Sequence, residues 1–192
     1  TPRVDPGLAA IKVEHIDQTG ESDLHFLTRL AKKHDAVATV KKGHLVFLPI
    51  NGTKSSSGQE LGAITITRAA GDQHRYHSAD RNAYSGVRAY WHDKKGAEKK
   101  SVLVGTEENE KRLKDTYGSE DDAMAAARAE QGRVERGKAT MELTLALAQP
   151  ELMPQTAVVV SGFKPEIDST PWQVVKVTHS LGDQGFTTRL EL

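Results

Sequence analysis

The stretch that decides the fold is TGESDLHFLTRLAKKHDAVATVKKGHLVFLPI, residues 19–50, because a helix signal passes there directly into a hairpin signal. Ser22 can accept a hydrogen bond from a backbone N–H at the start of a helix, and Asp23 places negative charge in the positively polarised first turn. Apolar side chains then recur at helical spacing, at Leu24, Leu27 and Ala31. The pattern predicts a helix over residues 22–34.

Two short β-prone runs follow this helix. Residues 36–40 and 44–48 are separated by Lys42-Gly43, which supplies the glycine that a tight hairpin connection needs. Pro49 lacks a backbone donor and disfavours continuation of the ladder. We therefore expect a hairpin over residues 36–48.

The segment before the helix and the tract after the hairpin complete the first part of the chain. A weak alternation at Ile11, Val13 and Ile16 predicts a strand or an extended lead-in. Residues 51–60, NGTKSSSGQE, are polar turn formers and predict a linker or a long exposed loop. Residues 1–55 are thus expected to form a small α+β segment.

Composition limits the classes of function. The 192 residues include 37% hydrophobic residues, which is typical of a globular chain of one or two domains. The 26 basic and 26 acidic side chains give a formal charge of zero, so no global field favours nucleic acid or an anionic membrane. The absence of cysteine excludes disulfides and thiolate metal sites. No apolar run approaches the roughly 20 residues that span a bilayer.

A second unit is expected over residues 61–192. The pattern predicts several strands, one helix and then further strands, which differs from the regular alternation of a parallel α/β sheet. The expected strands are residues 61–67, 84–93, 101–105, 141–148, 157–161, 172–181 and 186–192. The predicted fold is α+β: a mostly antiparallel β-barrel with one packed helix, preceded by the small helix and hairpin.

The helix of this second unit has clear ends. Ser119 is the expected N-cap with Asp122 three residues on, and Gly137 follows the last turn, so the helix should span residues 119–136. Its apolar positions are mostly alanines, which allow close approach to a sheet.

Two strands carry the expected core of the second unit. Residues 141–148, MELTLALA, place Met141, Leu143, Leu145 and Leu147 on one face with a period of two. In the last strand, the expected inner-face residues are Phe186, Leu190 and Leu192. At roughly 1.5 to 3 kcal/mol for each buried side chain, these positions would dominate the stability of the unit.

One strand offers a candidate subunit interface. In NAYSGVRAYWHD, the side chains of Tyr84, Arg88 and Tyr90 are expected to share one strand face, opposite Val87, Ala89 and Trp91. Tyrosine and arginine are enriched in the cores of protein interfaces. Ordinary packing within the chain is the alternative.

The sequence contains little that indicates catalysis or metal binding. The best local group is Asp72, His74, His77 and Asp80, although two polar histidines on a surface hairpin are the better explanation. No GxSxG, HExxH, phosphate-loop or dinucleotide glycine motif occurs. Residues 107–114 are of mixed charge, which is typical of a solvated segment. We predict no catalytic residue, no cofactor and no metal site.

Several stretches resemble the phage late control gene D family, the hub proteins of contractile tails. The similar stretches are ESDLHFLTRLAKKHDAVATVKKGHLVFLP, DRNAYSGVRAYW, TYGSEDDAMAAARAE and the run from MELTLALAQP through GFKPEIDSTPW to the last residue. The resemblance covers essentially the whole chain. Family members are longer and carry a further β-rich domain at the N-terminus, so this chain resembles their C-terminal half.

The resemblance implies a structural hub in the virion tail baseplate, assembled in the bacterial host cytoplasm. In that role three copies form a ring that joins the tail tube protein to the central spike protein, without catalysis, nucleic-acid contact or membrane insertion. Residues 61–192 would be one tube-like barrel domain. Two alternatives are a tail-associated peptidoglycan-degrading enzyme and a type VI secretion spike-like protein. The source could be a phage, a prophage or a tail-like bacteriocin.

Overall fold

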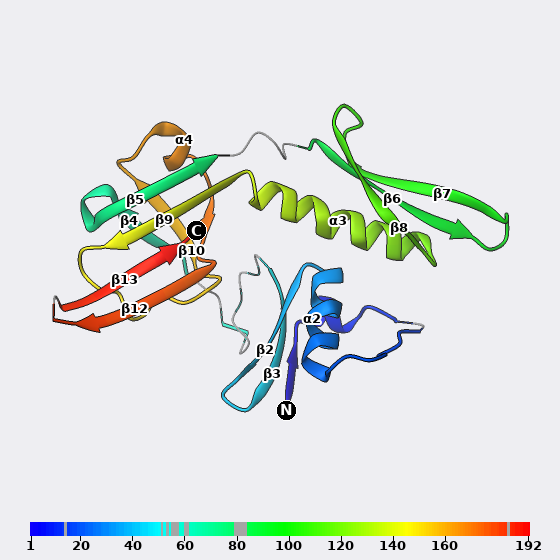
Figure 1. The fold of residues 1–192 in the computed structure, drawn as a ribbon, viewed down its shortest axis with the longest axis horizontal. Helices are drawn as coiled ribbons and strands as arrows, with labels where there is room; N and C mark the ends of the chain where they lie inside the picture. The colour runs from blue at the N-terminus through cyan, green and yellow to red at the C-terminus, as the bar shows by residue number, and fades with distance from the viewer. Residues whose placement is uncertain are drawn as a thin grey trace. The chain divides into compact units, whose positions relative to one another are not determined.

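The computed structural model describes residues 1–13, 15–50, 52, 54, 58–59, 62–78, 84–183 and 185–192, apart from the side chain of residue 72. The chain forms two compact units. The first comprises residues 1–50 and 79–138, and the second comprises residues 51–78 and 139–192. Both mix helices with sheets, as the α+β prediction requires (Figure 1). No helix in the described part of the chain is both long and apolar enough to cross a bilayer.

The first unit begins with a helix on a small sheet. Its elements are β1 (Pro2–Val4), α1 (Pro6–Ala9), α2 (Asp23–Lys33), β2 (Ala36–Lys41) and β3 (His44–Pro49). The strand order is β1-β3-β2, with β1 parallel and β2 antiparallel to β3. Ala31, Ala36 and Phe47 form its buried core. This arrangement confirms the predicted helix and hairpin over residues 22–48.

Local signals explain both elements. Ser22 caps α2, because its hydroxyl oxygen accepts a hydrogen bond from the His25 N–H at 3.3 Å. Lys42 and Gly43 have φ values of 48° and 74°, the left-handed pair that a two-residue hairpin turn requires. Of the two alternatives predicted for residues 11–16, the strand is wrong, because the described residues 11–13 and 15–16 have no regular secondary structure; the short strand of this segment is Pro2–Val4.

The second part of this unit is a three-stranded sheet covered by a helix. Its elements are β6 (Gly86–Asp93), β7 (Glu98–Gly105), β8 (Glu110–Tyr117) and α3 (Glu120–Arg136), with the strand order β7-β6-β8. Ser119 caps α3 by accepting from the Asp122 N–H at 3.2 Å. Ala123 and Ala127 are fully buried against the sheet. Their small side chains allow the helix to lie close to the strands, which confirms the predicted helix over residues 119–136.

Ion pairs link α3 to the N-terminal part of the same unit. The Lys33 ammonium donates to Asp122 at 2.8 Å, and the Arg136 guanidinium donates to both carboxylate oxygens of Asp35 at 2.9 and 2.5 Å. The Arg133 guanidinium also donates to the backbone carbonyl of Lys32. These contacts join residues 89 to 101 positions apart, so they are not local consequences of helix formation.

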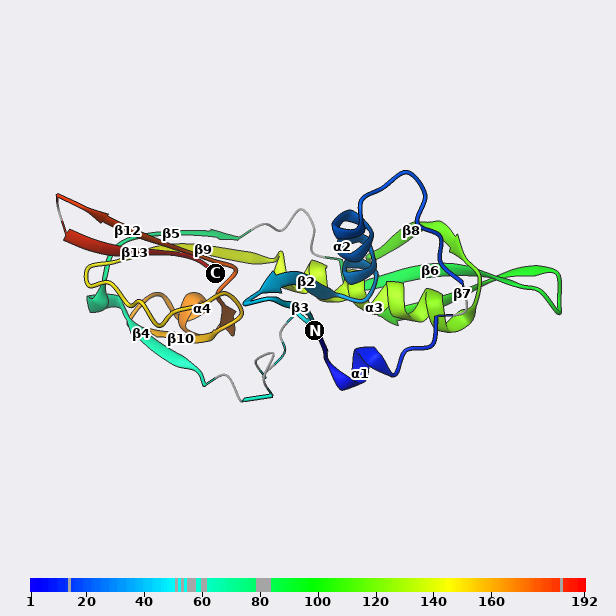
Figure 2. The same ribbon diagram turned by 90° about the horizontal axis from the view of Figure 1, so that it is seen from below.

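The second unit contains two sheets around one core. One has the order β12-β13-β9-β5 and the other β11-β10-β4. The elements are β4 (Ile64–Thr67), η1 (Arg68–Ala70), β5 (Gly71–Ser78), β9 (Ala139–Leu145), β10 (Ala157–Ser161), α4 (Pro165–Asp168), β11 (Trp172–Gln173), β12 (Lys176–Gly182) and β13 (Gly185–Glu191). Figure 2 shows the two sheets of this unit as separate layers. In the described residues the sheets are not closed into a barrel.

Most of the predicted core positions are buried. Met141, Leu143 and Leu145 are each 1% exposed, and Leu190 is fully buried. Leu147 was expected on the same face and is 81% exposed, because β9 ends at Leu145 and the chain turns away. Phe186, also assigned to the inner face, remains 41% exposed near the end of its hairpin.

Some predicted boundaries differ from those observed. A short 3-10 helix, Arg68–Ala70, follows β4 and leads into β5, so the run that holds His74 and His77 is a strand. Residue 61, the expected start of a strand, lies outside the described residues, and β4 begins at Ile64. The compact units also cut across the predicted division into residues 1–55 and 61–192, since β6, β7, β8 and α3 group with the N-terminal segment. The expectation that residues 61–192 act as one tube-like domain stays a prediction.

Candidate interaction face

Strand β6 separates an apolar face from a polar one. Val87 and Ala89 are fully buried and pack with the helix α3, while Arg88 and Tyr90 alternate with them and so lie on the opposite side of the sheet. Trp91 packs against the same buried cluster as Val87. The sheet therefore turns one face to the core and presents Arg88 and Tyr90 on the other, which we call the polar face.

Arg88 is the centre of an ion-pair network on the polar face. Its guanidinium donates to Glu110 Oε2 at 2.7 Å, to Glu107 Oε1 at 2.9 Å and to Ser101 Oγ at 3.2 Å. Arg112 donates to the second oxygen of Glu110 at 2.7 Å. The four charged side chains thus alternate in sign, in the order Glu107, Arg88, Glu110 and Arg112, and each arginine pairs with at least one carboxylate. Such a network fixes the side chains in one orientation.

The carboxylate of Glu110 is held in its charged form. Hydrogen bonds from Arg112 and then Arg88 lower the pKa of Glu110 below its usual value, and the pKa of Arg88 is raised, first by its hydrogen bond to Glu110. The side chain of Glu110 is only 10% exposed. The sequence prediction treated residues 107–114 as a solvated segment, and Glu110 corrects it. The sequence signal for this ion pair is that Glu110 and Arg112 are two residues apart, which places them on the same face of a strand.

The two tyrosines of the predicted interface occupy different surroundings. Lys99 lies over the ring of Tyr90, with Nζ 4.3 Å from the ring centroid. Tyr84 precedes β6 and lies beside Lys111, whose Nζ is 5.7 Å from the ring centroid and which bonds Glu130 of the helix α3 at 2.6 Å. The structure therefore brings Arg88 and Tyr90 together on the polar face and places Tyr84 outside the strand.

The histidines of the weak metal motif do not converge. His74 and His77 both lie on β5, three residues apart, so their side chains leave opposite faces of the strand. The ring of His74 meets Phe163 edge-on, with centroids 5.1 Å apart. Residue 80 and the side chain of residue 72 lie outside the described part of the structure. Within that part, no group of three possible ligands is found.

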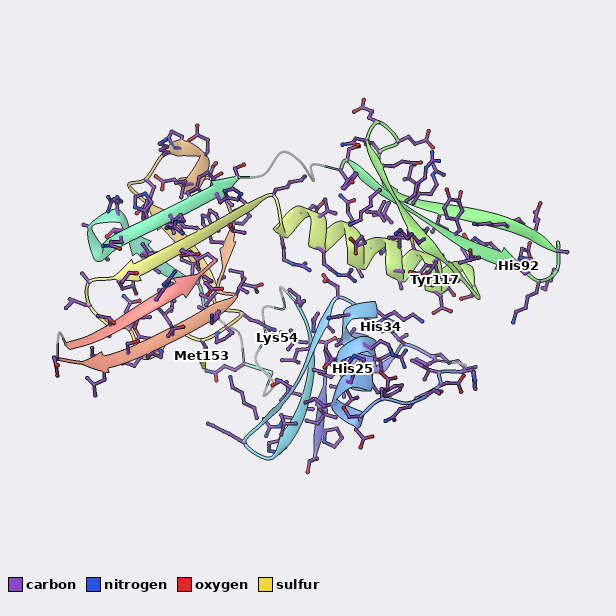
Figure 3. All side chains as sticks on the ribbon, viewed as in Figure 1. His25, His34, Lys54, His92, Tyr117 and Met153 are labelled. Carbon is purple, nitrogen blue, oxygen red and sulfur yellow. The ribbon has the colours of Figure 1, made fainter. Side chains whose placement is uncertain are left out.

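Two hollows lie in the N-terminal part of the first unit. One is polar and surrounds Glu21, which accepts hydrogen bonds from His25 Nδ1 and from the Arg29 guanidinium. The other is an apolar cleft of about 220 Å³ between β3, α2 and the segment that precedes α2. His34 lines this cleft, and burial lowers the pKa of its imidazole, which favours the neutral ring. Figure 3 labels His25 and His34 on and beside α2.

Sequence comparison relates the chain to one family. A family model described as phage tail baseplate hub (GPD) matches residues 4–185. Proteins described as probable baseplate hub proteins of Escherichia phages 186 and P2 are 38% and 36% identical over 233 and 229 residues. The matches cover 100% and 98% of this chain and 60% and 59% of the relatives. The chain thus spans about 60% of the length of these relatives.

Comparison with solved structures supports the fold. The tail protein from Neisseria meningitidis MC58 matches with a TM-score of 0.65 at 14% identity, covering 93% of this chain and 56% of that one. The 43 kDa tail protein of prophage MuSo2 from Shewanella oneidensis matches with a TM-score of 0.64 at 17% identity, covering 91% and 54%. At these identities the likeness concerns the fold alone.

Proposed function

Because the chain belongs to the phage tail baseplate hub (GPD) family, we propose that it forms part of a structural hub, in which three copies make a ring that joins the tail tube to the central spike. The observation that carries this proposal is the family match over residues 4–185. The relatives' description as baseplate hub proteins agrees with a structural, non-enzymatic role. The proposed partners are further copies of the chain, the spike protein and the tube protein.

The proposed ring has a physical rationale in the sheets. The terminal strands β12 and β5 of one sheet, like β11 and β4 of the other, each have one edge without a strand partner among the described pairings. Exposed edges present unpaired backbone donors and acceptors, and a closed ring can cover them. We propose that residues 61–192 act in the ring as one tube-like unit, closed into a barrel in that assembly. Such a unit would resemble the units of the tail tube that the ring meets.

The polar face supplies candidate residues for contacts between subunits. Arg88 and Tyr90 on this face, and Tyr84 just before the strand, are of the types that interfaces favour. Arg88 already has intramolecular carboxylate partners, so it would enter a contact in a fixed orientation rather than as a free charge. The proposal places the protein in the virion baseplate after assembly in the host cytoplasm, with no catalytic step, cofactor, nucleic-acid contact or membrane insertion.

The proposal can be tested by co-expressing the protein with its cognate spike and tube proteins. The molar masses of the purified complexes, measured by light scattering, should correspond to three copies of the chain on one spike trimer. A parallel assay of murein hydrolysis should show no release of muropeptides. Turnover that disappears on mutation of a single carboxylate would replace the structural proposal with an enzymatic one.

A further inference from the structure

The hairpin of β6 and β7 extends beyond the rest of its sheet. The last pairing of β8 joins Tyr117 to Trp91, whereas β6 and β7 remain paired as far as Asp93 and Glu98. Residues 92–99 therefore form a two-stranded ribbon, which we call the arm. At about 3.3 Å per residue, the two strand residues beyond Trp91 carry the arm roughly 7 Å past the third strand, and the turn of residues 94–97 extends it further. Figures 1 and 2 show the arm projecting past the end of α3, and Figure 3 labels His92 on it.

The arm is ordered by contacts of its own. Lys100 donates to Asp93 at 2.7 Å and approaches Glu98 at 3.1 Å, and the Lys95 N–H donates to Asp93 Oδ1 at 3.0 Å. Lys99 lies over the ring of Tyr90. A two-stranded ribbon is marginally stable in water by itself, so these contacts keep it in shape. Apart from the half-buried Asp93, residues 92–99 are exposed, so the arm adds little to the core. A pre-organised projection of this kind is suited to binding.

The tip of the arm is positively charged. Residues 92–100 hold four lysines and two carboxylates, Asp93 and Glu98, and both carboxylates pair with Lys100. No carboxylate partner is found for Lys94, Lys95 or Lys99 in the described residues. The chain has a formal charge of zero, so these lysines do not belong to a general cationic surface. They form a local cluster, to which a cluster of exposed carboxylates would be complementary.

Such a cluster lies at the base of the arm. The helix α3 begins at Glu120, three residues after Tyr117, and Tyr117 pairs with the last residue before the arm. Asp115, Glu120 and Asp121 are exposed there, and the described residues offer none of them a cationic partner. The arm points away from this base, so its tip cannot neutralise the acidic cluster of its own chain. A surface with both clusters is complementary to a second copy of itself.

We propose that the arm docks on a second copy of this chain, with Lys94 and Lys95 at its tip meeting Glu120 and Asp121 at the base of the neighbour's arm. Eight ribbon residues cover less than the roughly 1,200 Å² of a stable interface, so the contact orients neighbouring copies rather than holding them together alone. The contact follows from the charge pattern of one unit and does not require the trimeric ring proposed above.

The absence of cysteine makes disulfide mapping a direct test. Chains carrying Lys95→Cys are mixed at high concentration with chains carrying Asp121→Cys and are oxidised, and the disulfide-linked heterodimer is quantified. The matched control pairs Lys95→Cys with Lys138→Cys, an exposed position beyond the other end of α3. We expect about threefold more heterodimer for the first pair, because Lys94 and Glu120 are retained and a single exposed ion pair contributes about 0.5 to 1 kcal/mol. Circular dichroism verifies that every variant is folded.

Charge reversal separates this contact from random collision. Adding Lys94→Glu to the arm should remove the excess heterodimer, and adding Glu120→Lys to the neighbour should restore it. Equal yields for the two cysteine pairs, or an excess that ignores the charges, would overturn the proposal. Retention of the chain by a single-stranded DNA oligonucleotide, with loss of the crosslink, would assign the arm to nucleic acid instead. If the protein forms a trimer but the two cysteine variants give no excess of crosslinked heterodimer, the proposed ring stands and the proposed arm contact is refuted.

Discussion

The close approach of two backbone segments at the start of β6 makes Gly86 a sensitive position. A Cβ at Gly86 would lie 2.2 Å from the carbonyl oxygen of Thr106, 2.8 Å from the Thr106 nitrogen and 2.9 Å from the Val104 carbonyl oxygen. All three are backbone atoms, so a side-chain rotation cannot relieve the overlap. The Thr106 N–H also donates to the Ser85 carbonyl at 3.0 Å. Gly86→Ala must therefore separate the two segments or break this hydrogen bond.

The expected cost combines two terms. Overpacking costs about 1–3 kcal/mol and the loss of one backbone hydrogen bond about 1 kcal/mol, so Gly86→Ala should lower the free energy of unfolding of the first unit by about 3 kcal/mol. Urea unfolding followed by the fluorescence of Trp91 measures this, in a Trp172→Phe background that removes the tryptophan of the second unit. Gly118→Ala is the matched control, because nothing lies within 4 Å of its added Cβ. A cost for Gly86→Ala within about 0.5 kcal/mol of the control would refute the close approach.

Three further substitutions test the core, a helix cap and an ion pair. Leu190→Ala removes a fully buried side chain and should cost about 3 kcal/mol in urea unfolding, whereas Leu181→Ala, at a position 84% exposed, should cost almost nothing; equal costs would contradict the placement of β13. Ser119→Ala should lower the thermal stability of the first unit by about 1 kcal/mol through loss of its helix cap, and an unchanged melting curve would contradict the cap. The hydrogen bond from Lys33 is the main cause that lowers the pKa of Asp122, so ionised Asp122 stabilises the fold above the ordinary Asp pKa, and this contribution is lost as the pH falls through the lower pKa of the folded state. Lys33→Met should reduce this loss of stability at acid pH, measured as unfolding curves over a pH series. An unaltered pH dependence would exclude the ion pair.

The sequence was sufficient to predict helix caps and the hairpin turn, because these features depend on residues close together in the chain. Ser22 and Ser119 cap their helices as the sequence predicts, because capping needs only a side chain and the N–H groups of the next turn. The turn at Lys42-Gly43 follows from its glycine in the same way. The alternation on β6 also separated Val87 and Ala89, which are buried, from Arg88 and Tyr90 on the other face.

The sequence did not predict the end of β9, the pairing of the sheets or the ion pairs of Arg88, because these depend on residues far apart in the chain. Leu147 continues the period of two in sequence, but β9 stops because Ala146 bonds back to Ala70 and Gln149 bonds to Thr188. Whether sheets close into a barrel is decided by pairing between strands far apart in the chain, and the described sheets remain separate. The partners of Arg88 lie 19 and 22 residues away, so its ion pairs could not be inferred from spacing.

The measurement that tests the hub proposal most directly is the molar mass, by light scattering, of the protein expressed from its complete reading frame, alone and mixed with the cognate spike protein. The proposal predicts a trimer that captures one spike trimer. A protein that stays strictly monomeric at high concentration and ignores the spike would contradict it.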